Sequence, residues 1–280
     1  MYSINTINDF KKLIENLSVT HFLMPSIFIG HGSPMNGIEN NEFSNHWKEI
    51  GKNIHQPTAV LVISAHWFTS GTQITSMDFP KTIHDFSGFP DDLYQIQYPA
   101  PGDVMLANEA ANLIQSTTVQ LTHEWGLDHG AWTVLRHMYP EANIPVIQMS
   151  IDYTKDARFH YLLGKELFQL RKKGVLILGS GNIVHNLRLV AWDKLHQTNY
   201  GFDWAISISN LFKHHIAEGH HNALIEYQKL GKEAIMAVPT PEHYLPLLYV
   251  LGLQTQKDSI SFFNDKHIGG SLTMTSLLVG

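Results

Sequence analysis

The chain has 280 residues, with 25 acidic and 19 basic side chains and a formal net charge of -6. This balance gives no basic footprint, so we exclude nucleic acid as the main partner. The absence of cysteine excludes disulfides, thiolate metal sites and cysteine nucleophiles, so nitrogen and oxygen must supply the ligands of any transition metal. Histidine is unusually frequent, with 18 residues.

The N-terminal segment is predicted to be a helical extension of the main domain. Residues 6–17 carry apolar side chains at helical spacing, which predicts an amphipathic helix. We assign residues 1–24 to an N-terminal helical extension and residues 25–280 to a single domain, because no linker or repeat divides them. The segment lacks the apolar stretch of a secretory signal, and no apolar run is long enough to cross a bilayer, so we expect a cytoplasmic protein.

Short, uniformly apolar runs predict strands that are buried on both faces of a sheet. They cover residues 26–29, 59–64, 144–149 and 175–178. Helical patterns cover residues 41–54, 103–116, 130–138, 156–173, 202–217 and 221–229. This alternation predicts an α/β fold, a three-layer α/β/α sandwich around a mixed, largely parallel sheet.

Three of the predicted strands run directly into segments that contain histidine. The first leads into GHGSP with His31, the second into AHW with His66, and the fourth into GSGNIVHN with His185. Taken singly, His31 could cap a helix and His66 could be a core histidine bonded to the backbone. In open α/β sheets, however, ligands bind outside the carboxyl ends of the strands. We therefore expect these three histidines to meet at one edge of the sheet.

Further histidines that do not follow a predicted strand are also candidates for a functional site. His243 lies in PTPEHYLP, where three prolines restrict the backbone and hold Glu242 beside it. His129 precedes a predicted helix, and capping of that helix by Asp128 is an equally good explanation of the segment. Residues 213–221, KHHIAEGHH, could form a surface metal patch, although adjacent histidines on a polar helix usually form a solvated face.

This combination of side chains favours metal chemistry. Two histidines, a third nitrogen or oxygen ligand and open positions suit Fe(II) in oxygen chemistry, and Zn²⁺ accepts the same ligands. Iron at an open site would bind a catechol through both oxygens, with O₂ beside it, while a histidine moves protons. Histidine suits this task because its unperturbed pKa of about 6.5 lies near working pH. His129 and His185 are the candidates, and the pattern does not separate a proton carrier from a ligand.

Six segments follow one another in a characteristic order. They are GHGSPMN (30–36), VISAHW (62–67), GFPDDLYQIQYPAPG (88–102), WGLDHGAW (125–132), GSGNIVHNLR (179–188) and PTPEHYLPLLY (239–249). Together they resemble the signature blocks of the 4,5-DOPA extradiol dioxygenase family, within the class III (LigB-like) extradiol ring-cleavage dioxygenases. The resemblance covers residues 25 to about 280.

The resemblance implies a single α/β/α domain and one divalent metal per chain, Fe(II) for ring cleavage or Zn²⁺ as bound in bacterial members. It implies that His31, His66 and His243 bind this metal. His185 would be a fourth ligand or an acid/base beside the metal. His129 would face the substrate and assist proton transfer.

Three hypotheses of function follow from these observations. The leading one is ring cleavage of a DOPA-like catechol with O₂. In the wider class a glutamate is typically the third iron ligand, whereas His243 occupies the matching stretch here with Glu242 beside it. A zinc-dependent hydrolase, with Glu242 as the carboxylate base, is the second hypothesis. The third is a non-enzymatic binding protein on the same scaffold, as in Memo-like relatives. The patterns specify neither the physiological substrate nor the oligomeric state.

Overall fold

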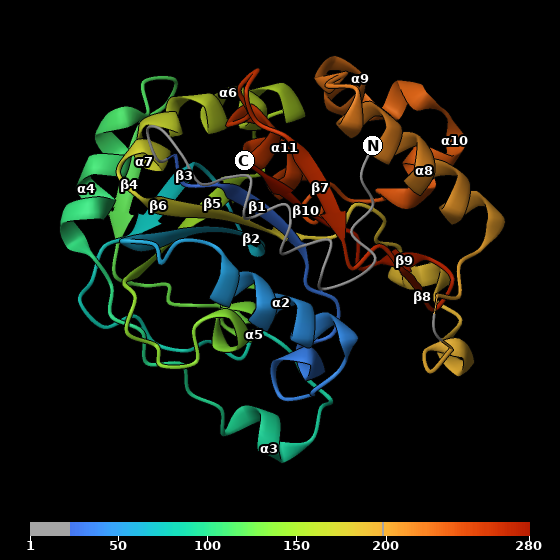
Figure 1. Ribbon diagram of the computed structural model, residues 1–280, viewed down its shortest axis with the longest axis horizontal. Coiled ribbons are helices and arrows are strands. Elements are labelled where there is room, and N and C mark those ends of the chain that lie inside the picture. The colour runs from blue at the N-terminus through green and yellow to red at the C-terminus, as the bar shows by residue number, and fades with distance from the viewer. Residues whose placement is uncertain (1–22, 198) are drawn as a thin grey trace.

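The computed structural model describes residues 23–197 and 199–280, so the helix predicted for residues 6–17 lies outside the described residues. Within those residues, an eight-stranded sheet runs through the centre with helices on both faces (Figure 1). Its strand order is β4-β3-β5-β2-β6-β1-β10-β7. The division of the chain into residues 1–24 and a single domain over residues 25–280 stays a prediction.

The strands pair in both directions. The central strands β5, β2, β6 and β1 are parallel, whereas β3 joins β5, and β10 joins β1 and β7, in antiparallel pairs. The predicted α/β class with a mixed, largely parallel sheet is therefore confirmed. The strands are β1 Ser26–Gly30, β2 Ala59–Thr69, β3 Thr72–Thr75, β4 Val119–Thr122, β5 Val146–Asp152, β6 Val175–Gly181, β7 Ile260–Phe263, β8 His267–Ile268, β9 Leu272–Thr273 and β10 Ser276–Val279.

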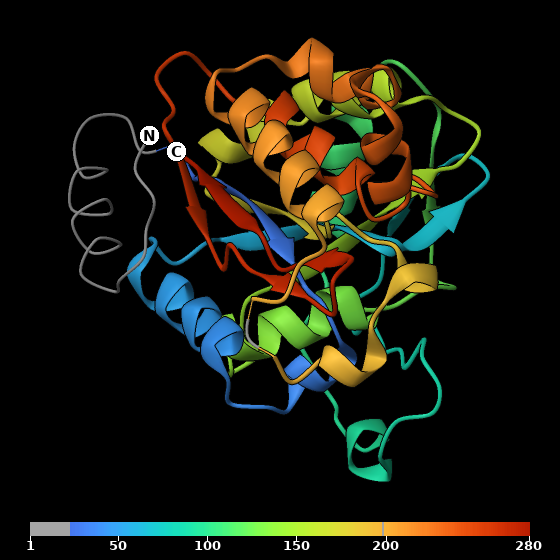
Figure 2. The same cartoon turned by 90° about the vertical axis from the view of Figure 1, so that its right-hand side faces the viewer.

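Helices form a layer on each face of the sheet (Figures 1 and 2). One layer contains α2 Glu42–Asn53 and α5 His129–Met138. The opposite layer contains α4 Val104–Leu113, α6 Ala157–Glu166, α7 Phe168–Lys172, α8 Asp203–Ala217, α9 His221–Ile225, α10 Lys232–Ala237 and α11 Leu245–Gly252. The short α3 Asp91–Tyr94 projects from the loop between β3 and α4. The 3₁₀ helices are η1 Pro34–Gly37, η2 Leu187–Leu189, η3 Trp192–Lys194 and η4 Tyr227–Leu230.

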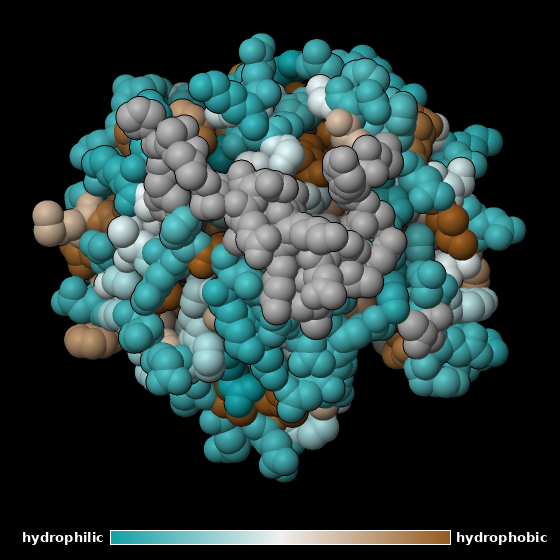
Figure 3. Space-filling model, in the orientation of Figure 1, coloured by the Kyte–Doolittle hydropathy of each residue, from teal (hydrophilic) through white to brown (hydrophobic). Residues whose placement is uncertain are grey.

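The central strands are apolar throughout because each of them contributes to two cores. Successive side chains of a strand point to opposite faces. In β1, Ile27 and Ile29 pack with α2 and α5, while Phe28 packs with the opposite layer. Full burial of each such side chain stabilises the fold by about 1.5–3 kcal/mol. The surface in Figure 3 is mainly hydrophilic, with scattered apolar side chains.

The predicted helices differ from the structure at two places. Residues 156–173 form α6 and α7 rather than one helix, because the N–H groups of Leu167 and Leu170 bond to carbonyls three residues back, at Gly164 and Leu167. Residues 221–229 divide in the same way into α9 and η4. None of the described helices combines the length and apolarity that a bilayer crossing requires.

Candidate metal centre

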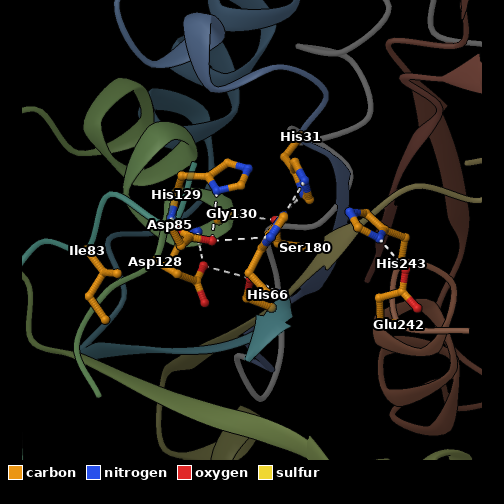
Figure 4. A network of polar contacts seen from close by, with 12 residues as sticks. His31, His66, Ile83, Asp85, Asp128, His129, Gly130, Ser180, Glu242 and His243 are labelled. Atoms are coloured by element: carbon orange, nitrogen blue, oxygen red, sulfur yellow. Dashed lines mark hydrogen bonds and ion pairs between the residues drawn. The ribbon is translucent and has the colours of Figure 1, made fainter. Parts of the chain in front are cut away.

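Histidines from well-separated segments converge at the carboxyl ends of the central strands (Figure 4). The ring centroids of His66 and His129 lie 3.8 Å apart, and those of His31 and His66 lie 5.0 Å apart. His243 lies 5.1 Å from His66, and His185 lies 3.6 Å from His243, again between ring centroids. The expected meeting of His31, His66 and His185 at one edge is therefore observed, and His129 and His243 join them.

The strand register brings these segments to the same level. Gly30 of β1 pairs with Gly181 of β6, so His31 follows immediately at the edge. The prediction that the second strand ends before His66 is wrong, because β2 continues to Thr69. Its pairing with β5 shifts between Ile63 and Phe68, and this irregularity contains His66. Such irregularities re-aim a side chain, as they do here.

Two glycines leave room for the cluster. A Cβ atom on Gly181 would lie 2.1 Å from the carbonyl oxygen of His243, so glycine is required where these two backbones meet. The contact is completed by the Asn182 N–H, which donates to the same oxygen at 2.9 Å. A Cβ atom on Gly130 would lie 3.1 Å from Cδ2 of His66. A larger residue at either position would displace an imidazole.

Hydrogen bonding determines which nitrogen of His31 faces the cluster. The Nδ1 atom of His31 lies 2.9 Å from Ser180 Oγ, and the Ser180 hydroxyl donates to the Gly130 carbonyl at 2.6 Å. Since a hydroxyl has a single proton, Ser180 Oγ must accept from His31 Nδ1–H. The Nε2 atom of His31 therefore carries a lone pair.

One carboxylate orients two further imidazoles. Asp85 Oδ2 lies 3.2 Å from Nδ1 of His66 and 3.0 Å from Nδ1 of His129. Asp85 Oδ1 accepts the backbone N–H of His129 at 2.8 Å. Burial raises the pKa of Asp85, but the hydrogen bond and charge of His129 outweigh burial and leave the pKa below its ordinary value. An ionised carboxylate only accepts, so Asp85 favours the form of each imidazole that carries a proton on Nδ1, and a neutral ring in that form has its lone pair on Nε2.

The two lone pairs of His31 and His66 face each other. Their Nε2 atoms lie 3.0 Å apart, and in the tautomers favoured by Ser180 and Asp85 neither atom has a proton to share. Two lone pairs at this distance repel unless a cation lies between them. Metal–nitrogen bonds of about 2.0–2.1 Å that meet near a right angle separate two ligand nitrogens by about 3 Å. The ligand atoms of His31, His66 and His129 all lie within 4.8 Å of one another. The donor set therefore fits a divalent metal.

His243 and His185 form the other side of the cluster. Their rings are stacked, with an interplanar angle of 10°. Glu242 Oε1 lies 3.2 Å from Nδ1 of His243 and accepts the Thr240 hydroxyl at 2.8 Å. The carboxylate thus lies behind His243, on the side away from His66 (Figure 4). The ligand atoms of His185, Glu242 and His243 also lie within 4.8 Å of one another.

Burial keeps these imidazoles neutral. It lowers the pKa of His66 to about 3, with the charge of His129 as the next cause, and lowers the pKa of His185 to about 4. Burial also lowers the pKa of His31 and His243, and neighbouring histidine charges add to this effect. At neutral pH each of these four rings is therefore neutral and has one unprotonated nitrogen, which is the state that binds a metal.

Asp128 holds the start of α5 in place beneath the cluster. Its side chain accepts the Ala131 N–H at 3.2 Å, so capping of this helix by Asp128 is confirmed. It also accepts the Ser64 hydroxyl at 2.7 Å and the Gln148 amide. Burial and the charge of Asp85 raise the pKa of Asp128 to about 6. The cap positions His129 at the first residue of α5.

Asp85 and Ser180 were not identified from the sequence. Asp85 stands in a loop, and its only local signal is a single carboxylate next to Phe86. Ser180 falls just after the predicted strand of residues 175–178, whereas β6 continues to Gly181, and a serine at this place has no distinctive spacing. The neighbouring His84 does not join the cluster, because its Nε2 atom bonds to the Ile96 carbonyl at 3.0 Å.

Comparisons with known proteins agree with this geometry. Residues 19–274 match the family model described as the catalytic LigB subunit of aromatic ring-opening dioxygenase. The chain is 43% identical over 273 residues to the 4,5-DOPA dioxygenase extradiol of Escherichia coli (strain K12), covering 96% of this chain and 99% of that protein. It is 37% identical over 231 residues to the protein of the same name from Mirabilis jalapa, covering 80% and 85%. A crystal structure of an uncharacterized protein from Escherichia coli K12 matches with a TM-score of 0.79 at 40% identity, covering 92% and 100%.

Proposed function

The chain belongs to the LigB family of aromatic ring-opening dioxygenases, and we propose that it opens the ring of a DOPA-like catechol with O₂ at a mononuclear metal. It is an extradiol ring-cleavage enzyme and thus an oxidoreductase. The observation that carries the proposal is the pair of Nε2 atoms of His31 and His66, which face each other 3.0 Å apart. Cleavage between C4 and C5 would place both oxygen atoms of O₂ in a muconate semialdehyde, so no further reductant is consumed.

We assign the metal to His31, His66 and His243, whose ring centroids lie 5.0–5.5 Å apart, with His185 beside them as a fourth ligand or as an acid/base. The ligand atom of His129 also lies within 4.8 Å of those of His31 and His66, and in this proposal it serves the substrate. The nitrogen and oxygen donors of the cluster suit Fe(II) and Zn²⁺ alike. When bound, Fe(II) supplies the electron exchange between catechol and O₂, which Zn²⁺, having no redox chemistry, does not supply. The active enzyme in this proposal is therefore the Fe(II) form.

His129 is the proposed proton carrier. Asp85 holds its Nδ1–H at 3.0 Å, so Nε2 is the basic atom that would accept a proton from a catechol hydroxyl. The ionised Asp85 would then stabilise the imidazolium. The ring of Phe86 lies 5.6 Å from that of His129 and would help to exclude water. Asp85 also orients His66, in the way that carboxylates orient metal-binding histidines.

The structure favours this function over a zinc hydrolase. Such a hydrolase needs a carboxylate that activates water. Asp85 is engaged by two imidazoles, and Glu242 is engaged by Thr240 and His243. A non-enzymatic binding protein would not require imidazoles whose tautomers are set by three separate acceptors.

Anaerobic reconstitution tests the proposal. The metal-free chain is loaded with Fe(II), mixed with L-DOPA or catechol and exposed to air. We expect a new visible absorbance from the semialdehyde and uptake of one O₂ per ring opened, with no colour from Zn²⁺-loaded protein. A fully iron-loaded chain that yields no product from any catechol tested would contradict the proposal. Product formed under strict exclusion of O₂ would instead support a hydrolase.

A further inference from the structure

A second group of histidines lies at the C-terminal end of α8. The rings of His214, His215 and His220 form a triangle, with centroid separations of 5.6 Å, 5.6 Å and 6.0 Å. The Nδ1 atoms of His215 and His220 lie 3.4 Å apart. His214 and His220 are exposed, and His215 is half-buried. The adjacent His221 is not part of this triangle, because its Nδ1 atom contacts the Tyr161 hydroxyl at 2.9 Å.

The backbone holds His215 and His220 together. The helix ends with hydrogen bonds from the His220 N–H to the His215 carbonyl at 2.9 Å and from the Gly219 N–H to the Ile216 carbonyl at 3.2 Å. Gly219 has a φ angle of +67°. This is the Schellman arrangement, in which a left-handed glycine turns the chain back over the last helical turn. The turn therefore fixes the backbone of His215 and His220 in positions from which their imidazoles can reach each other.

The spacing and the surroundings suit a cation. Two nitrogens on a tetrahedral metal with bonds of about 2.0–2.1 Å lie about 3.3–3.4 Å apart. The C-terminal end of a helix carries a partial negative charge, which favours a bound cation. The nearby ammonium group of Lys213 is engaged by Asp265 at 2.5 Å, which offsets its positive charge. Burial and the charges of His214 and His220 lower the pKa of His215, which favours the unprotonated form.

We propose that His215 and His220, assisted by His214, form a second metal site that takes a divalent ion with a preference for imidazole, such as Zn²⁺, Ni²⁺ or Cu²⁺. The close pair of His215 and His220 supplies two nitrogen ligands, the ring of His214 lies beside them, and exposure leaves the remaining positions to water. The site does not depend on the function proposed for the buried cluster. It is expected to bind more weakly, since exposed side chains must be ordered on binding.

Counting metal equivalents on the full chain tests the proposal. Metal-free protein is titrated with Zn²⁺, and the equivalents bound are measured by calorimetry and native mass spectrometry. We expect two equivalents for the unmodified chain. The double variant His215→Asn/His220→Asn should weaken the second equivalent at least tenfold. His123→Asn, at a single exposed histidine, is the matched control and should retain both equivalents.

Single variants sharpen the assignment. His220→Asn should weaken the second equivalent more than His214→Asn, because His220 belongs to the close nitrogen pair. Matching thermal unfolding of the metal-free variants would show that the fold is retained. A single equivalent on the unmodified chain, or two undiminished equivalents on the double variant, would overturn the proposal.

Discussion

The buried cluster at the strand ends and the exposed triangle at the end of α8 contain the same side chain in two different settings. In the buried cluster, the Nδ1 atoms of His31, His66 and His243 each face a fixed acceptor. Within the described part of the chain, no carboxylate contacts the rings of His215 or His220. The fold has therefore ordered the buried imidazoles in advance, whereas a metal at the exposed triangle must order its own ligands. The two sites thus differ less in the number of histidines than in the neighbouring groups that hold each imidazole in a fixed orientation.

Loss of a buried imidazole should have the largest effect. His66→Ala removes one of the two facing Nε2 atoms, so we expect loss of the tightly bound metal and product formation at the background rate. Metal content by mass spectrometry and absorbance after addition of L-DOPA measure the two effects. His123→Ala, at an exposed position, serves as the control. Retention of both metal and activity by His66→Ala would exclude His66 as a ligand.

Loss of the orienting carboxylate should have the next largest effect. Asp85→Asn leaves His66 in place but lets the amide donate where the carboxylate only accepted, so the imidazole tautomers are no longer enforced. We expect metal affinity to fall roughly 10–100-fold, measured by competition with a chelator. We also expect the pH profile of turnover to change, because His129 loses its partner.

Asp91→Asn makes the same change at an exposed position, the first residue of α3, and should alter neither property. If Asp85→Asn keeps the metal affinity and the pH profile of the unmodified chain, Asp85 does not orient His66 and His129.

Acid should destabilise the metal-free buried cluster. The pKa of His185 is about 4 in the folded chain, against about 6.5 when unfolded, so the unfolded state binds more protons between these values. Stability that is present above pH 6.5 is thus lost as the pH falls toward 4. His185→Asn should remove up to about 2 kcal/mol of the loss between pH 7 and pH 5.

Urea unfolding of both metal-free proteins at the two pH values measures this difference. Between pH 7 and pH 8 the two proteins should show the same change, because the imidazole is then neutral in both states. An equal loss at pH 5 would show that His185 is not desolvated.

The exposed triangle should contribute least to stability. His215→Asn/His220→Asn changes side chains at the surface, so the free energy of unfolding of the metal-free chain should change by about 0.5 kcal/mol or less. The urea midpoint measures this change. A loss of several kcal/mol would show that the pair has a structural role that its exposure does not suggest.

Much of the fold could be predicted because its signals are local. The strands at Ser26–Gly30 and Val175–Gly181 have short apolar runs, and Asp128 at the start of α5 is a typical capping residue. Strands β3 and β4 were missed, because they have four residues each and their residues are in part polar. Their place in the sheet depends on neighbours that come from elsewhere in the chain.

The sequence by itself determined that histidines would gather at the ends of buried strands, that cysteine would take no part, and that six blocks of one enzyme family were present. Only the tertiary structure decided how the imidazoles are oriented. His31 meets Ser180 across 149 positions and His129 meets Asp85 across 44 positions. Such contacts depend on strand register and loop packing, which no local pattern encodes. The division of the histidines into an ordered buried centre and an exposed triangle is therefore a property of the fold.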